Sequence, residues 1–433
     1  MTGDGWTSIN QEYFLAITAH YFKDEKMKRV TLGVFQLYGK KTAILLMKSV
    51  TETYNKMLPD QSLITSFVVD GGANYNKASE TIVDEENVNC FAHTLQIPIN
   101  KVLSPSKGDN KFHTCVTLVR NLMKKVKYTP SLQEDFKFKS FPLDVCTRWS
   151  STHRMCVQFN KEKLEYFQVV EKLNKFEMEE LKLPNWDVLS AICFCLEIFS
   201  KFTKFVEAES YITISHIPRF VFEVQNFLKP GKQSSEIEEL NKELLKHFNA
   251  KFDHILKDMN NPYIFSACLD PLYGDLYFIK DKTRDQIWKN LLTEIQKNPL
   301  HGFKKEMMSS IEFQLLEVRK IFVNDSPEIR NGSKVDGLES LTSFNYNSFA
   351  FWKEWESNFG RTLSTYARMY LSRPATSCSS ERAFKSAGII YSEERASLNT
   401  ETVERIVFIK ENKHLLPKEI EELSKLILFE NPK

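Results

Sequence analysis

The sequence predicts a mixed α/β domain followed by a long all-helical region and a helical C-terminus. Strand and helix patterns alternate through the first hundred residues, whereas strand patterns nearly vanish between about residue 112 and residue 330. Helical periodicity continues through the last hundred residues. Apolar residues make up 42% of the 433 residues, and 33 residues are Phe, so we expect large cores rich in aromatic side chains.

The elements of the first domain are expected in the order βββαβαβα. A short strand near Asp4 precedes two β-rich aromatic runs that are typical of a hairpin. The helix that follows stops before Pro59. The next run, LITSFVVD, is almost continuously apolar, as in a strand covered on both faces. After the first strand, these elements are expected at 13–22, 27–39, 41–58, 63–70, 74–83, 88–91 and 93–103.

Long helical patterns dominate the remainder of the chain. Residues 104–111 form a loop by composition, and residues 327–337 are the best linker candidate. The run at 185–208 is too apolar for a free surface helix, so we expect it in a core. The C-terminal helices are expected at 349–359, 380–391 and 402–416.

Bulk charge and cysteine content exclude few function classes. A net charge of +2 argues neither for nor against a nucleic-acid partner, so local patches must decide that question. No run approaches ~18 consecutive apolar residues, and polar residues follow Met1, so we expect neither a membrane span nor a signal peptide. The eight cysteines are scattered, which is typical of reduced thiols in a cytosolic or nuclear protein.

Two carboxylates accompany the predicted strands. Asp70 follows a buried strand and precedes two glycines, at the edge where α/β sheets usually bind ligands. Asp4 lies in a neighbouring strand of the same sheet if residues 1–6 form a strand. Converging carboxylates bind Mg²⁺ or Mn²⁺, which prefer oxygen ligands. The structural alternatives are a turn-forming Asp-Gly at residue 70 and a loop residue at position 4.

A third carboxylate, Glu381, begins a helical run after the corner RPATSCSS (373–380). The residue three positions before it is Cys378, so the capping-box register does not fit. On a helix, Glu381 shares a face with Phe384 and Gly388, which indicates a buried face. A buried carboxylate needs a cation or strong partners, so the pattern favours a functional role over a cap.

Several stretches, in order along the chain, resemble the catalytic portion of hAT-superfamily (hobo, Activator) DNA transposases and of host proteins domesticated from them. Together they span nearly the whole chain, which makes the resemblance specific although each stretch alone is weak. They are DGWTSINQEYFLAITAHY (4–21), FVVDGGANYNKA (67–78), CFAH (90–93), DVCTRWSSTHRM (144–155), ACLDPLYGD (267–275) and YARMYLSRPATSCSSERAFKSAGIIYSEERASL (366–398).

The resemblance implies a ribonuclease-H-like catalytic core interrupted by a large helical insertion. The core would begin at 1–150, the insertion would be 151–337, and 338–433 would complete the core and include the hAT dimerisation region. The catalytic acids of the family fall on Asp4, Asp70 and Glu381. These acids are expected to hold two Mg²⁺ or Mn²⁺ ions for DNA cleavage, hairpin formation on flanking DNA and strand transfer.

Two accessory motifs carry over from the family. Cys90 and His93 match its C-x-x-H near the active site, and Arg148 and Trp149 match an Arg-Trp pair associated with DNA bases. From the sequence alone, a tryptophan at this position is more often a core residue. A zinc site built from the C-x-x-H pair with His113 and Cys115 fits no standard finger, so we do not expect zinc.

The expected partners are DNA at transposon ends and a second copy of the chain, bound through the C-terminal region. The cluster Lys124, Lys125 and Lys127 is a weak candidate for phosphate contacts, since charge runs are usually solvated faces. The resemblance implies a nuclear protein, or a cytoplasmic one if it is domesticated, with no membrane partner.

The sequence also departs from the family pattern. Only three residues precede Asp4, so an N-terminal BED-type zinc finger has no counterpart and the chain looks N-terminally truncated. Lys385 stands where the family usually has Ser, and its charge can pair with Glu381. Two hypotheses follow: a transposase core that still cuts DNA but does not transpose autonomously, or a domesticated or decayed relative that acts by dimerisation and DNA or protein binding. An unrelated metal hydrolase would explain the carboxylates but not the ordered motifs.

Overall fold

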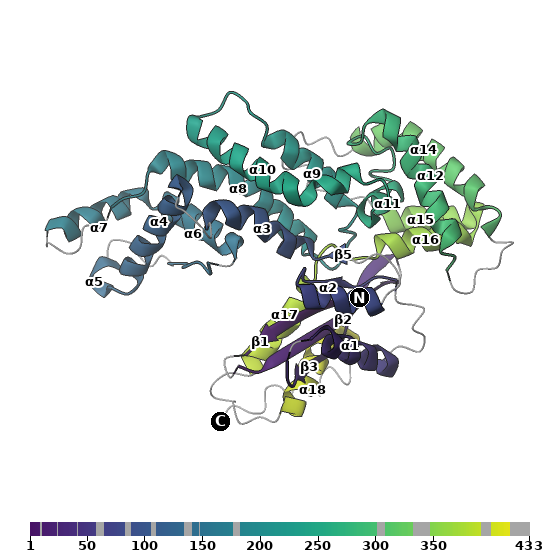
Figure 1. Cartoon of the computed structure of the whole chain (residues 1–433), viewed down its shortest axis with the longest axis horizontal. Coiled ribbons are helices and arrows are strands. Elements are labelled where there is room, and N and C mark those ends of the chain that lie inside the picture. Colours follow the sequence, from purple (N-terminus) through teal and green to yellow (C-terminus); the bar gives the residue numbers. More distant parts are fainter. Residues whose placement is uncertain are drawn as a thin grey trace.

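The computed structural model describes residues 1–8, 11–23, 25–40, 42–57, 65–82, 88–104, 110–133, 141–146, 148–175, 182–300, 308–331, 347–390 and 400–415. A small sheet with helices α1, α2, α17 and α18 lies beneath the middle of an elongated layer of helices (Figure 1). The chain starts in the sheet, runs through the helical layer and returns to the sheet near its C-terminus.

The sheet has five strands in the order β3-β2-β1-β4-β5. The first three strands form an antiparallel meander, while β4 and β5 add to β1 in parallel orientation. This combination needs a helical crossover before each parallel strand, and α1 and α2 supply it. The strands are β1 (Thr2–Thr7), β2 (Tyr13–Lys23), β3 (Lys26–Leu37), β4 (Val68–Val69) and β5 (Val88–Asn89).

The two faces of the sheet are covered by helices from opposite ends of the sequence. Because side chains alternate along a strand, Leu15 and Ile17 of β2 pack with α1 (Ala43–Met57) and α2 (Ala73–Ile82). On the other face, Phe14 and Ala16 pack with α17 (Cys378–Ile390) and α18 (Thr400–Asn412). One face of the sheet is therefore covered only when the C-terminal helices α17 and α18 return to it.

The helical layer has an aromatic core, as the abundance of Phe predicts. Phe202 and Phe220 stack with ring centroids 3.7 Å apart, and Phe91 brings the start of α3 into the same core. Asparagine side chains cap α4, α8, α11 and α15, and Gly360 adopts φ +95° at the turn between α15 and α16. The described helices of this layer are α3 (Phe91–Leu103), α4 (Lys111–Lys127), α5 (Pro130–Gln133), α6 (Trp149–Lys161), α7 (Lys163–Lys175), α8 (Trp186–Val206), α9 (His216–Phe227), α10 (Ser235–Lys257), α11 (Pro262–Cys268), α12 (Asp281–Lys297), α14 (Ile311–Asn331), α15 (Ser348–Phe359) and α16 (Arg361–Leu371).

The order βββαβαβα is confirmed, and the described residues after β5 form helices but no strand. The predicted strand at 63–70 is regular only at Val68 and Val69, because its pairing with β1 ends there. The linker prediction at 327–337 is wrong in its first part, since α14 continues to Asn331. The boundary at 337 lies outside the described residues, and both domain boundaries stay predictions. None of the described helices is long and apolar enough to span a membrane.

Candidate functional site

Two of the predicted acids are set side by side by the parallel pairing of β1 and β4. Thr2 pairs with Val68 and Gly3 with Val69, so the next residue on each strand is a carboxylate, Asp4 or Asp70. Asp4 is buried, with 8% of its surface exposed, whereas Asp70 is half-buried at the end of its strand. The sequence run that ends in FVVD is therefore a strand end beside β1, as predicted.

The serine-rich corner before α17 is anchored to the start of α3. The Phe91 amide donates to the Ala375 carbonyl oxygen at 2.9 Å, and the Ser377 amide donates to Cys90 Sγ at 3.3 Å. The Ala375 amide also donates to Thr213 Oγ1 in the loop between α8 and α9, at 3.0 Å. These contacts hold the first turn of α17, with Glu381, against the edge of the sheet that carries the C-x-x-H motif.

The result is a compact group of side chains whose atoms could hold a metal ion. The ligand atoms of Asp4, His93 and Glu381 all lie within 4.8 Å of one another, and this is the one such group in the described part of the chain. His93 Nε2 and Glu381 Oε1 are 3.6 Å apart, and Cys378 Sγ donates to the same oxygen at 3.9 Å. Two carboxylates and one imidazole form a donor set that suits Mg²⁺ or Mn²⁺ through oxygen and admits transition metals through nitrogen.

Burial and crowded charge shift the protonation of this group. Burial raises the pKa of Asp4 to about 7; His93 opposes this shift, and the charges of Glu381 and Asp70 add to it. For His93, burial alone would lower the pKa, but the interaction with Cys90 and the charges of Asp4 and Asp70 outweigh it and raise the pKa to about 10. In the absence of metal, a protonated His93 therefore balances the negative charge of the acids.

The raised pKa of Asp4 predicts a pH dependence with a definite sign. The folded-state pKa of about 7 lies above the ordinary value of 3.8, so the proton on Asp4 favours the folded state. This contribution is fully present below the ordinary pKa and is lost as pH rises through about 7. A divalent cation must displace the same proton, so its affinity is expected to rise over this range.

Denaturant titrations of the wild-type chain and the Asp4→Asn variant, in chelator between about pH 5 and pH 8, measure this effect. We expect the wild type to lose stability relative to the variant as pH rises. A constant difference between the two proteins would contradict the assignment.

The other two predicted acids differ from expectation in detail. Asp70 lies outside the group of three ligands, in which His93 joins Asp4 and Glu381, although the charge of Asp70 acts on both Asp4 and His93. Glu381 is not fully buried, since 33% of its side chain is exposed and its partner is His93. Lys385 is exposed, and the described ion pairs do not join it to Glu381.

The accessory residues divide between the site and the helical core. Cys90 is fully buried and His93 lies in the site, but His113 Nδ1 contacts the Leu103 carbonyl oxygen at 2.9 Å. The Cys115 thiol instead donates to the Asn185 carbonyl oxygen at 3.8 Å. Each of the last two side chains thus has a backbone partner of its own in the helical layer.

A base-stacking role for Trp149 does not agree with its position. The indole is 2% exposed and packs edge-on against Phe199 in the core of the helical layer. Both faces of a ring must be largely free of protein for a base to stack on it, so the core alternative holds here. Arg148, which precedes α6, is exposed and is available to a ligand.

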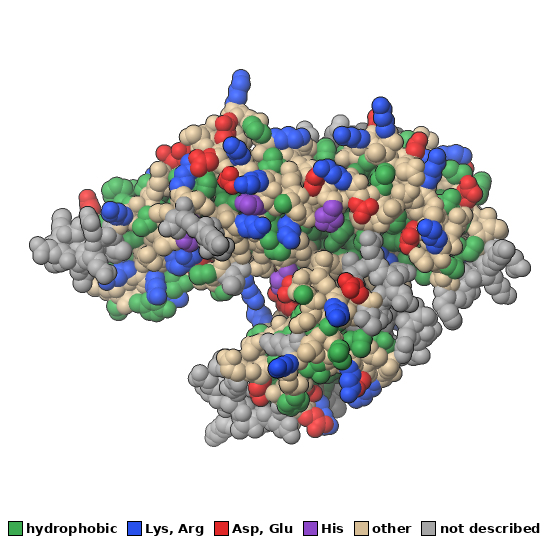
Figure 2. Space-filling model, in the orientation of Figure 1, with side chains coloured by type: hydrophobic (Ala, Val, Ile, Leu, Met, Phe, Trp, Pro, Cys, Tyr) green, Lys and Arg blue, Asp and Glu red, His purple; other side chains and the backbone are tan. Residues whose placement is uncertain are grey.

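The lysine cluster lies in the last turn of α4. Lys124 and Lys127 are exposed and Lys125 is half-buried. On the face of the molecule drawn in Figure 2, Lys and Arg side chains are scattered over the helical layer instead of gathering in one patch. This view agrees with the small net charge and adds no support for a strong phosphate-binding surface in that region.

Three side chains near the acids had no signal in the sequence. Tyr13 of β2 and Tyr75 of α2 share a hydrogen bond between their hydroxyl groups, and burial together with the charges of Asp4 and Asp70 raises the pKa of both. Glu207, at the end of α8, has a pKa raised by burial and by the nearby charge of Glu381. No spacing rule links these residues, because each comes from a different element.

Two family models match parts of the chain. Residues 338–413 match the hAT family C-terminal dimerisation region, and residues 88–195 match the ZBED1 RNase-like helical domain. The first match contains Glu381 and the second contains Cys90 and His93, so the two matched regions meet at the site.

Three relatives are similar over long alignments. The "Putative transcriptional regulator tpeD" of Talaromyces stipitatus is 23% identical over 93% of this chain and 52% of its own length. The "Putative AC transposase" of Zea mays is 20% identical over 95% of this chain and 56% of its own length. The hobo transposase of Drosophila melanogaster is 28% identical over 48% of this chain and 34% of its own length.

The chain thus spans about half the length of the first two relatives and a third of the last. Both family models, the two transposases and the order of the motifs indicate the same family of transposases. These matches support an hAT-family transposase or a protein derived from one.

Proposed function

We propose that the chain is the catalytic core of an hAT-like, DDE-type transposase that cleaves and joins DNA strands with divalent metal ions. The observation that carries this proposal is the meeting of Asp4 and Glu381, 377 positions apart (381 − 4), with ligand atoms within 4.8 Å across β1 and α17. The strand order β3-β2-β1-β4-β5, with an antiparallel meander and two parallel additions, supports a ribonuclease-H-like core.

The donor set supports Mg²⁺ or Mn²⁺ at these residues. Asp4 and Glu381 offer carboxylate oxygens, and Asp70 stands at the next strand end. Bound metal ions in such a site supply Lewis-acid stabilisation and activate water or a 3′-hydroxyl. The chain itself keeps Asp4 buried, pairs Glu381 with the imidazole of His93, and keeps Cys378 protonated beside them, because burial raises the pKa of that thiol.

The partners follow from the family. We propose DNA as the substrate, a homodimer formed through the region that matches the hAT dimerisation model, and action in the nucleus. Arg148, Lys124 and Lys127 are exposed and are candidates for DNA contacts, together with the half-buried Lys125. The Arg-Trp pair would then act through its arginine.

A second candidate function is a domesticated protein that binds DNA or protein as a dimer without cleavage. One observation favours it: the relative aligned over 93% of this chain is named a transcriptional regulator. The carboxylates would then be retained as a structural group, balanced by protonated His93 in the absence of metal.

A nicking assay separates the two functions. The purified chain is incubated with supercoiled and hairpin-forming DNA in Mg²⁺, in Mn²⁺ and in chelator. We expect nicking only with metal, and we expect Asp70→Asn to reduce it by at least about tenfold, because an amide is a poorer ligand than a carboxylate.

Asp281→Asn serves as the matched control, since that carboxylate is 89% exposed on α12. It is expected to nick like the wild type. A well-folded chain that neither nicks DNA nor binds Mn²⁺ would overturn the catalytic proposal and leave the second function.

A further inference from the structure

The first turn of α17 rests on β1 at two adjacent positions. Thr2 and Asp4 are two residues apart on β1, so their side chains point to the same face of the sheet. On that face Asp4 meets Glu381, and Thr2 meets the two serines that precede Glu381. Thr2 thus contacts the same turn that carries Glu381.

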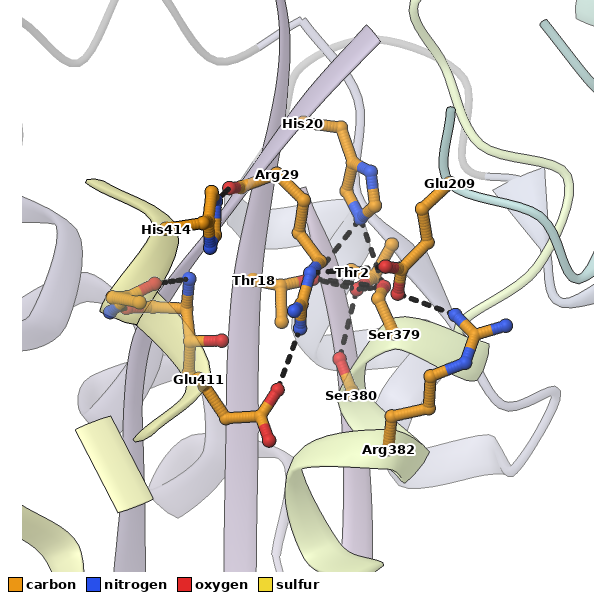
Figure 3. A network of polar contacts seen from close by, with 12 residues as sticks. Thr2, Thr18, His20, Arg29, Glu209, Ser379, Ser380, Arg382, Glu411 and His414 are labelled. Atoms are coloured by element: carbon orange, nitrogen blue, oxygen red, sulfur yellow. Dashed lines mark hydrogen bonds and ion pairs between the residues drawn. The ribbon is translucent and has the colours of Figure 1, made fainter. Parts of the chain in front are cut away.

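The contact at Thr2 is a buried cluster of hydroxyl groups, defined here as Thr2, Thr18, Ser379 and Ser380 with His20 at its edge (Figure 3). Thr2 Oγ1 lies 2.8 Å from Ser380 Oγ and 3.1 Å from Ser379 Oγ. It also lies 2.5 Å from Thr18 Oγ1, across the β1–β2 pair. The four hydroxyl residues are at most 2% exposed, so water does not compete for these bonds.

His20 of β2 contacts two members of the hydroxyl cluster, Ser379 and Thr18. Its Nε2 lies 2.9 Å from Ser379 Oγ and 3.1 Å from Thr18 Oγ1. The consecutive strands β1 and β2 and the distant helix α17 are thus joined by one set of short polar contacts (Figure 3). Networks of this kind fix one geometry when all members are satisfied.

Ion pairs with residues of other elements hold α17 at Arg382, which directly follows Glu381. Arg382 pairs with Glu209 in the loop after α8 at 2.5 Å, and Arg29 of β3 bridges the same Glu209 at 3.2 Å. Arg29 also pairs with Glu411 of α18 at 3.0 Å (Figure 3). The hydroxyl cluster and these ion pairs flank Glu381 on both sides along the chain.

We propose that the hydroxyl cluster is a positioning element that sets the Glu381 carboxylate against Asp4, and that Thr2 and Ser380 thereby determine the affinity of the site for divalent metal. This inference rests on the proposed metal-dependent function. Some residues orient the metal ligands without touching the metal themselves. Their removal commonly weakens metal affinity by about 10–100-fold.

The test compares Mn²⁺ binding to the full chain by titration calorimetry, without DNA and without any assay of activity. Thr2→Val keeps the shape of the side chain but removes the hydroxyl, and we expect its dissociation constant to rise by about tenfold or more. Thr2→Ser restores the hydroxyl and is expected to restore binding. Thr53→Val is the control, because Thr53 is a buried threonine of α1 whose hydroxyl donates within its own helix.

A purely structural role would lower the melting temperature of Thr2→Val while leaving the dissociation constant of the folded protein unchanged, and this result would overturn the inference. If Thr2→Val does not fold, the Mn²⁺ dissociation constant of Ser380→Ala is measured instead. A wild-type dissociation constant in that variant would also overturn the inference. If the wild-type chain binds no Mn²⁺, the proposed function fails first, and that outcome is distinguishable from failure of the positioning role.

Discussion

Replacement of Glu381 by Gln is expected to reduce metal-dependent DNA cleavage by at least about a hundredfold, because the site loses a charged ligand worth several kcal/mol in the transition state. Glu381 is central to the site, since its carboxylate meets both His93 and Asp4. The same change removes a negative charge beside Asp4, so the pKa of Asp4 is expected to fall, because Glu381 is one of the charges that raise it. Cleavage rates and Mn²⁺ affinity at several pH values measure both effects.

Glu401→Gln provides the matched control for this experiment. Glu401 is 66% exposed on α18 and pairs with Arg405, so its replacement changes the same chemical group outside the site. We expect it to cleave like the wild type. Retention of cleavage in Glu381→Gln, at unchanged metal affinity, would show that the carboxylate takes no part in the reaction.

Replacement of Asp270 by Ala is expected to destabilise the folded chain by about 2–4 kcal/mol, with no direct effect on the acids. Asp270 is fully buried and accepts three hydrogen bonds: from Ser215 Oγ at 2.5 Å, from Ser348 Oγ at 2.8 Å and from the Leu272 amide at 3.1 Å. These donors come from the start of α9, the start of α15 and the turn after α11. Without the carboxylate, three buried donors lose their common acceptor.

Denaturant unfolding of Asp270→Ala and of the exposed control Asp281→Ala measures this loss. Asp281 lies in the first turn of α12, so its removal is expected to cost less than about 1 kcal/mol. Equal stability of the two variants would mean that water or neighbouring groups replace the carboxylate.

Local patterns predicted most of the fold. The helix at 41–58 is observed at Ala43–Met57, and the apolar run at 185–208 is observed as the buried helix Trp186–Val206, because both signals are contained in a single stretch. The linker at 327–337 was the clearest error, since Pro and Gly in its composition hid the end of a helix that reaches Asn331. Composition reports average tendencies, which the context of a particular helix can override.

The candidate site was predictable in part. Asp70 is indicated by its place at a strand end, Asp4 by its place in a neighbouring strand, and Glu381 by a register that does not fit a capping box. Each of these signals is local. The resemblance to the hAT family joined the three acids and added Cys90 and His93. No local signal distinguishes Trp149 in a core from Trp149 on a surface, and here the surrounding helices bury it.

By itself, the sequence determined a mixed α/β and helical fold, the order of the first strands and helices and the resemblance to the hAT family, and it predicted the three acids, since these inferences depend on short patterns and ordered motifs. Only the tertiary structure decided which side chains meet. It brings Asp4, His93 and Glu381 within 4.8 Å, leaves Asp70 beside them, and seats Ser379 and Ser380 on Thr2. The physical reason is that α17 must return to β1 across more than 370 residues to bury Phe384 and Ala383 against the sheet, and contacts over such a separation follow from packing of the whole chain.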